Sequence, residues 1–349
     1  MGGNIFDQNV RADPLTYHRI LTHVRDVLAS SLNAQTTSIP FYRQKESFGD
    51  VDIIVEKEKV CFPQDEDRFK RLKQIINQHF HSSDHIHVND QVISFLYREK
   101  ESDQQGVQVD LIATQAHEMN ITKDYFSYND LGNLIGRIAH KMGVSFGHRG
   151  LLLVVREGTH VHDTIIVSQD TPLILEFLGY DPEKFRQGFD TPSDIFDYVV
   201  STPFFNKDLY LLENRNHVSR TRDRKRANYR GFLEYIEQRN LPSYEYPEDK
   251  KLWLPRLTEF FPNLPSQIKK VEEDIKERKQ QRSLYNGHVI QEITSLQGKD
   301  LGKVMSAFQS RFNDRQELIE YITTHPTTWK EEVKELALKI ISIQPKPKM

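Results

Sequence analysis

The sequence predicts an α+β fold, in which a mixed sheet with flanking helices is followed by a mainly helical C-terminal domain. Apolar strand patterns bounded by turn residues dominate the first part of the chain, and amphipathic helix patterns lie between them. Past Pro203 the composition changes to charged helical segments separated by proline-containing loops. A chain of 349 residues with 37% hydrophobic residues is long enough for two domains.

The first predicted element is a helix that begins at Asp13-Pro14, with a capping aspartate and a proline in the first turn. Its apolar residues fall on one face, so we expect it to pack on the sheet. Further helices are predicted from Phe69 to Phe80 and from Asn129 to Met142, and another begins at the capping sequence Thr191-Pro192. Lys57–Phe62 is interpreted as a strand continuation or a hairpin, and the apolar strand Leu151–Val155 is expected to be buried on both faces.

Two carboxylates lie two residues apart on a predicted strand that follows Gly49. Because successive side chains of a strand point to opposite faces, Asp50 and Asp52 share one face while Val51 and Ile53 point into the core. Two like charges this close are costly unless a cation neutralises them, and Mg²⁺ prefers oxygen ligands. The alternative interpretation is a solvated Asp-x-Asp pair at the end of a strand.

A second strand, Gly106–Ile112, carries Asp110 in an alternating apolar and polar pattern. If the two strands are neighbours, Asp110 lies beside the first pair. Three carboxylates on two adjacent strands form a layout suited to two-metal phosphoryl transfer.

These segments resemble the nucleotidyltransferase signature of the DNA polymerase beta (family X) superfamily. The matching residues of the signature are Phe41, Arg43, Glu46, Ser47, Gly49, Asp50 and Asp52. The strand around Asp110 is similar to the family's third-acid strand. The resemblance continues through Tyr125–Leu131, Asn133, Arg137 and Lys141–Gly143 to Thr191–Val199, and so covers roughly residues 38–205.

The resemblance implies a polymerase beta-like nucleotidyltransferase sheet and a Mg²⁺-dependent activity. Asp50, Asp52 and Asp110 would be catalytic and would bind two Mg²⁺ ions, with Mn²⁺ as a substitute. The residues that would contact a nucleoside triphosphate (NTP or dNTP) are Ser38, Arg43, Gly49, Tyr125, Phe126 and Asn133. The implied domains are a catalytic domain at 1–120, a nucleotide- and base-contacting subdomain at 121–205, and a basic helical domain at 206–349.

The sequence departs from the family pattern at three places. Ile39-Pro40 stands where the family has the Gly-Ser that cradles the triphosphate, and proline has no amide hydrogen to donate. Tyr128 replaces the glycine that follows the family's aromatic pair. Residues 1–38 leave no room for the family's DNA-gripping lyase domain. Gly2-Gly3 is interpreted as too distant from Asp50 along the chain to act as a substitute phosphate loop.

A local excess of positive charge follows residue 214 in a chain whose formal net charge is −3. Its basic residues are Arg215, Arg220, Arg222, Arg224, Lys225, Arg226 and Arg230. Together with Arg137 they are predicted to bind a polynucleotide, because such a run neutralises several phosphates. A charged, solvated helix is the alternative interpretation.

The favoured function is transfer of a nucleoside monophosphate to a hydroxyl, at the 3′ end of RNA or DNA, in the manner of terminal or transfer-RNA nucleotidyltransferases. The alternatives are a family X-like DNA polymerase, nucleotidylation of a protein or small molecule, and a catalytically inactive nucleic-acid-binding homologue. No membrane partner and no particular oligomeric state is predicted. The single cysteine, Cys61, excludes an internal disulfide and indicates a reducing, cytoplasmic compartment.

Overall fold

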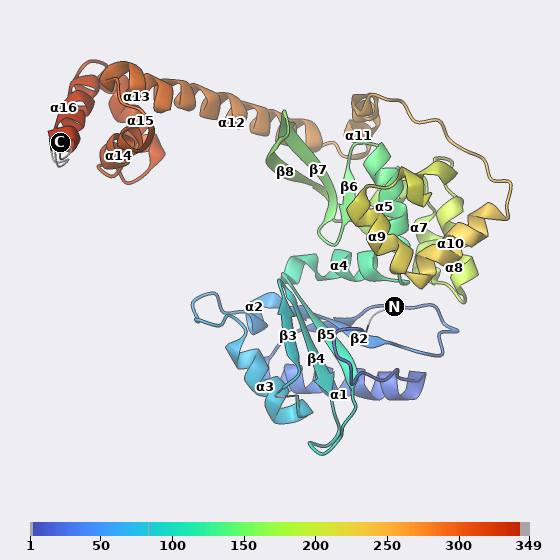
Figure 1. The fold of residues 1–349 in the computed structure, drawn as a ribbon. Coiled ribbons are helices and arrows are strands. Elements are labelled where there is room, and N and C mark those ends of the chain that lie inside the picture. Colours follow the sequence, from blue (N-terminus) through green and yellow to red (C-terminus); the bar gives the residue numbers. More distant parts are fainter. Residues whose placement is uncertain (1–2, 83, 343–349) are drawn as a thin grey trace. The chain divides into compact units, whose positions relative to one another are not determined.

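The computed structural model describes residues 3–82 and 84–342, and the chain divides into two compact units, Met1–Leu264 and Pro265–Met349. The protein is an α+β protein with a mixed five-stranded sheet and a largely helical C-terminal region (Figure 1). This confirms the predicted fold class at that level. Residues 206–264, which the sequence groups with the C-terminal domain, lie within the first unit. The division of the chain by function stays a prediction.

The five-stranded sheet has the order β1-β2-β5-β4-β3. Its strands are β1 (Thr36–Ser38), β2 (Asp50–Glu56), β3 (Ile86–Asn89), β4 (Val92–Tyr97) and β5 (Val107–Thr114). The central strands β2 and β5 run parallel, and every other pair is antiparallel. This pairing confirms that the two aspartate-bearing strands are neighbours.

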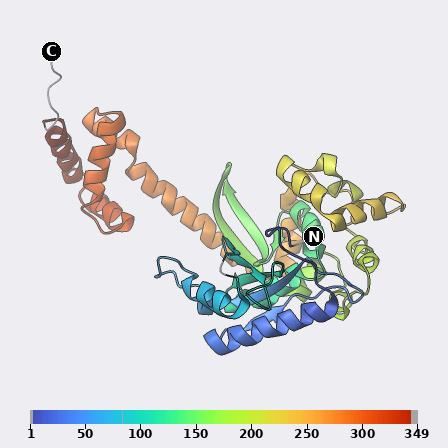
Figure 2. The ribbon, with the colours of Figure 1, turned by 60° about the horizontal axis from the view of Figure 1, so that its bottom comes forward.

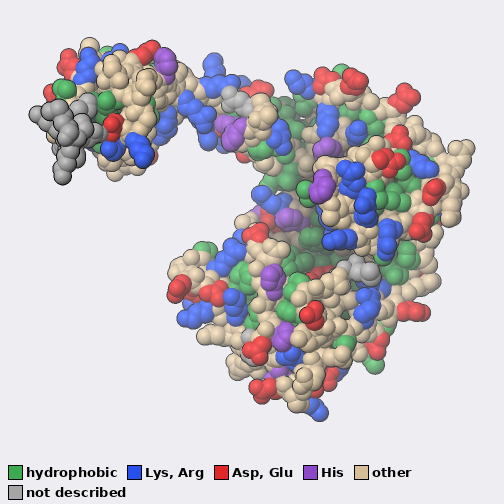
Figure 3. Space-filling view, in the orientation of Figure 1, with side chains coloured by type: hydrophobic (Ala, Val, Ile, Leu, Met, Phe, Trp, Pro, Cys, Tyr) green, Lys and Arg blue, Asp and Glu red, His purple; other side chains and the backbone are tan. Residues whose placement is uncertain are grey.

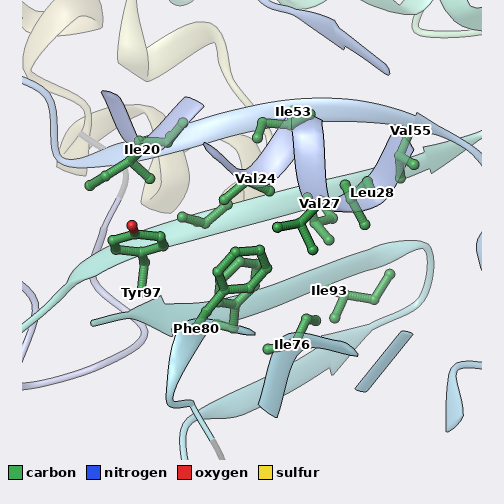
Figure 4. Close-up of a cluster of buried hydrophobic side chains, with 14 of the residues drawn as sticks. Ile20, Val24, Val27, Leu28, Ile53, Val55, Ile76, Phe80, Ile93 and Tyr97 are labelled. Carbon is green, nitrogen blue, oxygen red and sulfur yellow. The ribbon is translucent and has the colours of Figure 1, made fainter. Parts of the chain in front are cut away.

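One face of this sheet is covered by α1 (Pro14–Leu32) and α3 (Lys70–Phe80), which come forward in Figure 2. The Asp13 side chain caps α1 by accepting a hydrogen bond from the Thr16 backbone N–H, as predicted. Apolar side chains of both helices meet those of β2 and β4 in a continuous buried cluster (Figure 4). Val51, Ile53 and Val55 point into it, so Asp50 and Asp52 lie on the opposite face.

After β5 the chain forms the rest of the first unit, whose first α-helix is α4 (Met119–Phe126). Helix α4 contacts β1 and β2, and α5 (Leu131–Lys141) packs on the antiparallel sheet β6-β7-β8. That sheet consists of β6 (Ser145–Gly147), β7 (Gly150–Glu157) and β8 (His160–Ser168). The remaining helices are α6 (Thr171–Phe177), α7 (Pro182–Gln187), α8 (Pro192–Val200), α9 (His217–Lys225), α10 (Ala227–Glu237) and α11 (Leu254–Phe260).

Two expectations about local structure are wrong. The segment after β2 forms the short helix α2 (Lys57–Val60), and so it neither extends the strand nor forms a hairpin. In strand β7 the side chain of Leu151 is buried, but the side chains from Leu152 to Val155, on both faces of the strand, are partly exposed. The apolar run therefore reflects strand propensity and not two-sided burial.

The second unit is helical and has its own core. Its elements are α12 (Leu264–Leu284), α13 (Gly287–Thr294), α14 (Gly298–Gln309), α15 (Arg315–Thr324) and α16 (Thr328–Ser342). Tyr285, Phe308 and Trp329 pack together at its centre with ring centroids 6.0–6.3 Å apart. In the described part of the chain, no helix combines the length and apolar character that crossing a bilayer requires.

Candidate metal centre

Three aspartates converge at the start of the parallel strand pair. Asp52 of β2 lies directly opposite Asp110 of β5, and Asp50 lies opposite Gln108. One carboxylate oxygen from each of Asp50, Asp52 and Asp110 lies within 4.8 Å of the other two. These three residues are suited to holding a metal ion, and their convergence is the one that the alternating strand patterns predict.

The electrostatics of the trio are those of crowded, partly desolvated acids. Burial raises the pKa of Asp52 well above its ordinary value, and the charges of Asp50 and Asp110 raise it further. Burial also raises the pKa of Asp110, to about 6, although hydrogen bonds from the side chains of Ser94 and Gln108 partly oppose the effect. Such a cluster favours the binding of cations, because a bound cation relieves both the repulsion and the lost hydration.

Lys45 supplies positive charge to the cluster. Burial lowers the pKa of its ammonium group, and the carboxylates of Asp50 and Asp52 act in the opposite direction. The ammonium lies 4.6 Å from the centroid of the Phe48 ring and 3.5 Å from Oδ1 of Asn129. Lys45 therefore joins the acidic cluster to the start of α5, a role that the sequence pattern does not reveal.

The segment before α1 also reaches the cluster of three aspartates. The Gly3 backbone N–H donates to Asp50, which lowers the pKa of that carboxyl against the larger effect of burial. The Asn9 amide donates to the carbonyls of Gly3 (2.7 Å) and Gly49 (2.8 Å), and its oxygen accepts from the Gln108 backbone N–H (2.7 Å). From its separation along the chain, Gly3 was expected to lie far from Asp50. In the structure it lies against Gly49 and beside Asp50, so that expectation is wrong.

Gln108 holds the third carboxylate in place. Its side chain is buried, and Nε2 donates to both Asp110 oxygens, at 2.9 and 3.1 Å. Its Oε1 accepts from the Ile5 backbone N–H at 3.1 Å. The signal for this role is present in the sequence, because residues two apart on a strand share a face.

Arg43 joins two loops. Its Nε donates to the Asp190 carboxylate and its Nη1 donates to the Gln187 carbonyl at 2.9 Å. Backbone bonds from Arg43 and Gln44 to Phe189 and Asp190 fix the same contact. The predicted role of Arg43 in triphosphate binding stays a prediction. Ser38, the other candidate in this region, is the last residue of β1 and pairs with Ile53.

The remaining nucleotide candidates lie around the junction of α4 and α5. The Tyr125 ring packs against Phe126 and Phe146, with centroids 5.2 and 5.3 Å away. Tyr125 and Asn133 line a cavity of about 690 Å³, between α5, β6 and the start of α9. None of the three aspartates is among the described residues that line it.

The basic segment is organised by one buried acid. Asp223 is fully buried, and its carboxylate lies 2.8 Å from Arg137, 2.9 Å from Arg222 and 3.6 Å from Arg215. Arg226 pairs separately with Asp130. These four arginines are therefore engaged in ion pairs that help to join the α5 region to the α9 region. The other predicted nucleic-acid residues, Arg220, Arg224, Lys225 and Arg230, are partly or fully exposed.

Neither a protein-family model nor a curated protein matches this chain.

Proposed function

We propose that the protein is a divalent-metal-dependent nucleotidyltransferase with a polymerase beta-like catalytic sheet. It transfers a nucleoside monophosphate from a nucleoside triphosphate to the 3′ hydroxyl of RNA or DNA. The observation that carries the proposal is the convergence of Asp50, Asp52 and Asp110 on adjacent parallel strands. The order of the signature residues around them supports it.

The donor set fits Mg²⁺. All three groups offer carboxylate oxygens, the ligands that this hard cation prefers, and their raised pKa values indicate a need for compensating positive charge. Asp50 and Asp52 would hold both ions, and Asp110 would share the one nearer the acceptor. Bound Mg²⁺ would lower the pKa of the acceptor hydroxyl and offset the charge that develops on the phosphates.

The reaction is an in-line displacement at the α-phosphorus. The acceptor oxygen forms the new bond, the bond to the bridging oxygen breaks, and pyrophosphate leaves. In the proposed reaction Asp110 would orient the acceptor hydroxyl and take up its proton. Lys45, beside Asp50 and Asp52, offsets the negative charge that the triphosphate adds to the cluster.

End-adding transfer to a nucleic acid is favoured over nucleotidylation of a protein or small molecule. Exposed basic residues of α9 lie on the same unit as the acidic cluster. Figure 3 shows Lys and Arg side chains gathered over this part of the unit, next to a hollow. A positive surface of this kind attracts a polyanionic acceptor.

The decisive experiment supplies nucleoside triphosphates labelled at the α-phosphate, together with Mg²⁺, to the protein in three reactions. One contains pooled transfer RNA, one contains primed DNA and one contains no added acceptor. We expect label in a nucleic acid from the wild-type protein and none from Asp110→Asn, with both proteins equally folded by circular dichroism. Label retained by Asp110→Asn would reject the catalytic assignment.

A nucleic-acid-binding protein without transfer activity is the second candidate. It is favoured by Pro40, which offers no amide hydrogen, and by the engagement of Arg43 with Asp190. Calorimetric titration with a non-hydrolysable triphosphate and Mg²⁺ separates the two candidates. Binding heat supports the transferase, and no heat at millimolar ligand supports the binding protein.

A further inference from the structure

The cavity between α5, β6 and the start of α9 is lined by several side chains that carry hydrogen-bond donors. Among the described residues, the buried side-chain nitrogens without a partner include Asn133 Nδ2, Arg137 Nε and Arg215 Nε, and all three residues line this cavity. Arg215 Nε lies 3.6 Å from Asp223, which is too long for a hydrogen bond. Buried donors of this kind are costly when unpaired. The guanidinium and amide groups of the lining residues favour a ligand that supplies acceptors.

The charge of the lining favours an anion. Arg137, Lys141 and Arg215 line the cavity against one carboxylate, Asp208. Burial lowers the pKa of His140, and the nearby Lys250 and Lys141 lower it further, as expected where the local potential is positive. Beneath the lining, Asp223 orients the arginines. It is shared among three guanidinium groups and so leaves positive charge in excess.

Helix α9 adds to this preference. It begins at the cavity, where the Asn216 side chain accepts from the Ser219 backbone N–H, and both residues are part of the lining. The amino-terminal end of a helix carries partial positive charge and favours oxyanions. The helix end strengthens a site whose main donors are the two arginines and Asn133.

We propose that this cavity binds a phosphate group of a nucleic-acid strand, clamped by Arg137 and Arg215. Guanidinium groups suit a tetrahedral oxyanion because they donate two parallel hydrogen bonds. The rings of Tyr125, Phe146 and Tyr246 in the wall offer surfaces for the neighbouring sugar or base. A strand fits better than a free nucleotide because the exposed Arg224 and Lys225 supply further positive charge in the last turn of α9.

The choice of a strand as the source of the phosphate rests on the proposed function. The lining of the cavity contains none of the three aspartates, so the two sites are tested separately. Asp110→Asn is expected to keep strand binding while it loses transfer. A protein that binds strands at the cavity but transfers no nucleotide would contradict the proposed function and leave this inference standing.

Gly136 offers a matched pair of variants. It lies in the cavity wall, and a Cβ atom there meets only the Phe146 carbonyl oxygen, at an ordinary 3.5 Å. Gly136→Asp places a carboxylate in the cavity without removing an arginine, and Gly136→Ala controls for the added carbon. Melting temperatures establish that both variants fold. If Gly136→Asp does not fold, Ser219→Glu and Ser219→Ala form a second pair.

The measurement is fluorescence anisotropy of a labelled single-stranded oligonucleotide at several salt concentrations. We expect Gly136→Asp to bind about tenfold more weakly than Gly136→Ala. Because one phosphate contact is lost, the slope of log K against log salt should fall in magnitude by about 0.7. Equal affinity and equal slope in the two variants would overturn the proposal.

Competition distinguishes the sources of phosphate. Unlabelled oligonucleotide, nucleoside monophosphate and inorganic phosphate are each added to the wild-type complex. The proposal predicts efficient displacement by the oligonucleotide and displacement by the two small ligands only at much higher concentration. If the monophosphate binds the cavity tightly and the oligonucleotide binds equally well to both Gly136 variants, the cavity serves a free nucleotide and the strand proposal is wrong.

Discussion

At the scale of single residues, the Asp110 carboxyl gives the candidate metal centre a pH dependence. Burial raises its pKa from 3.8 to about 6, so between these values the folded protein holds a proton that the unfolded chain releases. The contribution of the Asp110 carboxyl to the free energy of unfolding is therefore fully present below about pH 4. It is lost as the pH rises through 6. The shift of roughly two units corresponds to at most about 3 kcal/mol.

Mg²⁺ should reverse this loss, because it binds the deprotonated carboxylates. We predict that millimolar Mg²⁺ raises the melting temperature more at pH 8 than at pH 5. In a metal chelator at pH 8, Asp110→Asn should melt higher than the wild-type protein, because it removes a crowded charge. Equal Mg²⁺ effects at the two pH values, measured by calorimetry, would contradict this account.

Gln108 is the residue whose loss should weaken metal binding without removing a ligand. Gln108→Leu deletes both hydrogen bonds to Asp110 and leaves the Ile5 backbone N–H without its acceptor. Groups that orient metal ligands typically contribute about 10- to 100-fold to affinity. We predict a loss of about tenfold in Mn²⁺ affinity, measured by titration. Gln104→Leu, on an exposed loop, is the matched control and should bind as the wild type does.

At the scale of elements, the segment before α1 connects the two aspartate-bearing strands. The Asn9 side chain makes three hydrogen bonds, to Gly3, Gly49 and Gln108. We predict that Asn9→Ala lowers the free energy of unfolding by about 1–3 kcal/mol, because it leaves partly buried groups unpaired. Urea denaturation measures the change. Gln8→Ala, at an exposed neighbouring position, should have almost no effect, and equal stability of the two variants would refute this role for Asn9.

Features that depend on residues close together in the chain were predictable from the sequence. The alternation of Asp50 to Val55 determines which face carries the acids, and Thr191 forms the capping box with Asp194 at the start of α8. The burial of β7 was not predictable, because an apolar strand pattern does not show what covers each face. Asn9 was missed, and Gly3 was judged too distant from Asp50, because their contacts join segments far apart in the chain.

The same distinction applies to the arginines. A run of basic residues predicts positive charge, and this prediction needs only composition. It does not show that buried Asp223 draws Arg137, Arg215 and Arg222 together, because that contact joins α5 to α9. Nor does the sequence show that Asn133 lies in the same cavity as Arg137 and Arg215.

At the scale of the whole molecule, each compact unit holds one of the two tryptophans. Trp253 lies buried in the first unit and Trp329 lies buried in the second. Because each unit has its own core, we predict that they unfold separately. Trp253→Phe and Trp329→Phe each leave one fluorescent reporter, and the two denaturation midpoints should differ. Coincident midpoints, with matching circular dichroism, would show one cooperative unit instead.

The central claim is that Asp50, Asp52 and Asp110 together bind divalent ions beside a nucleotide. Electron paramagnetic resonance of Mn²⁺, titrated into the protein with a non-hydrolysable nucleoside triphosphate, tests it most directly. The account predicts two protein-bound Mn²⁺ ions in the wild type and a loss of at least one in Asp52→Asn. Identical Mn²⁺ binding by the wild type and Asp52→Asn, or no binding by the wild type, would contradict it.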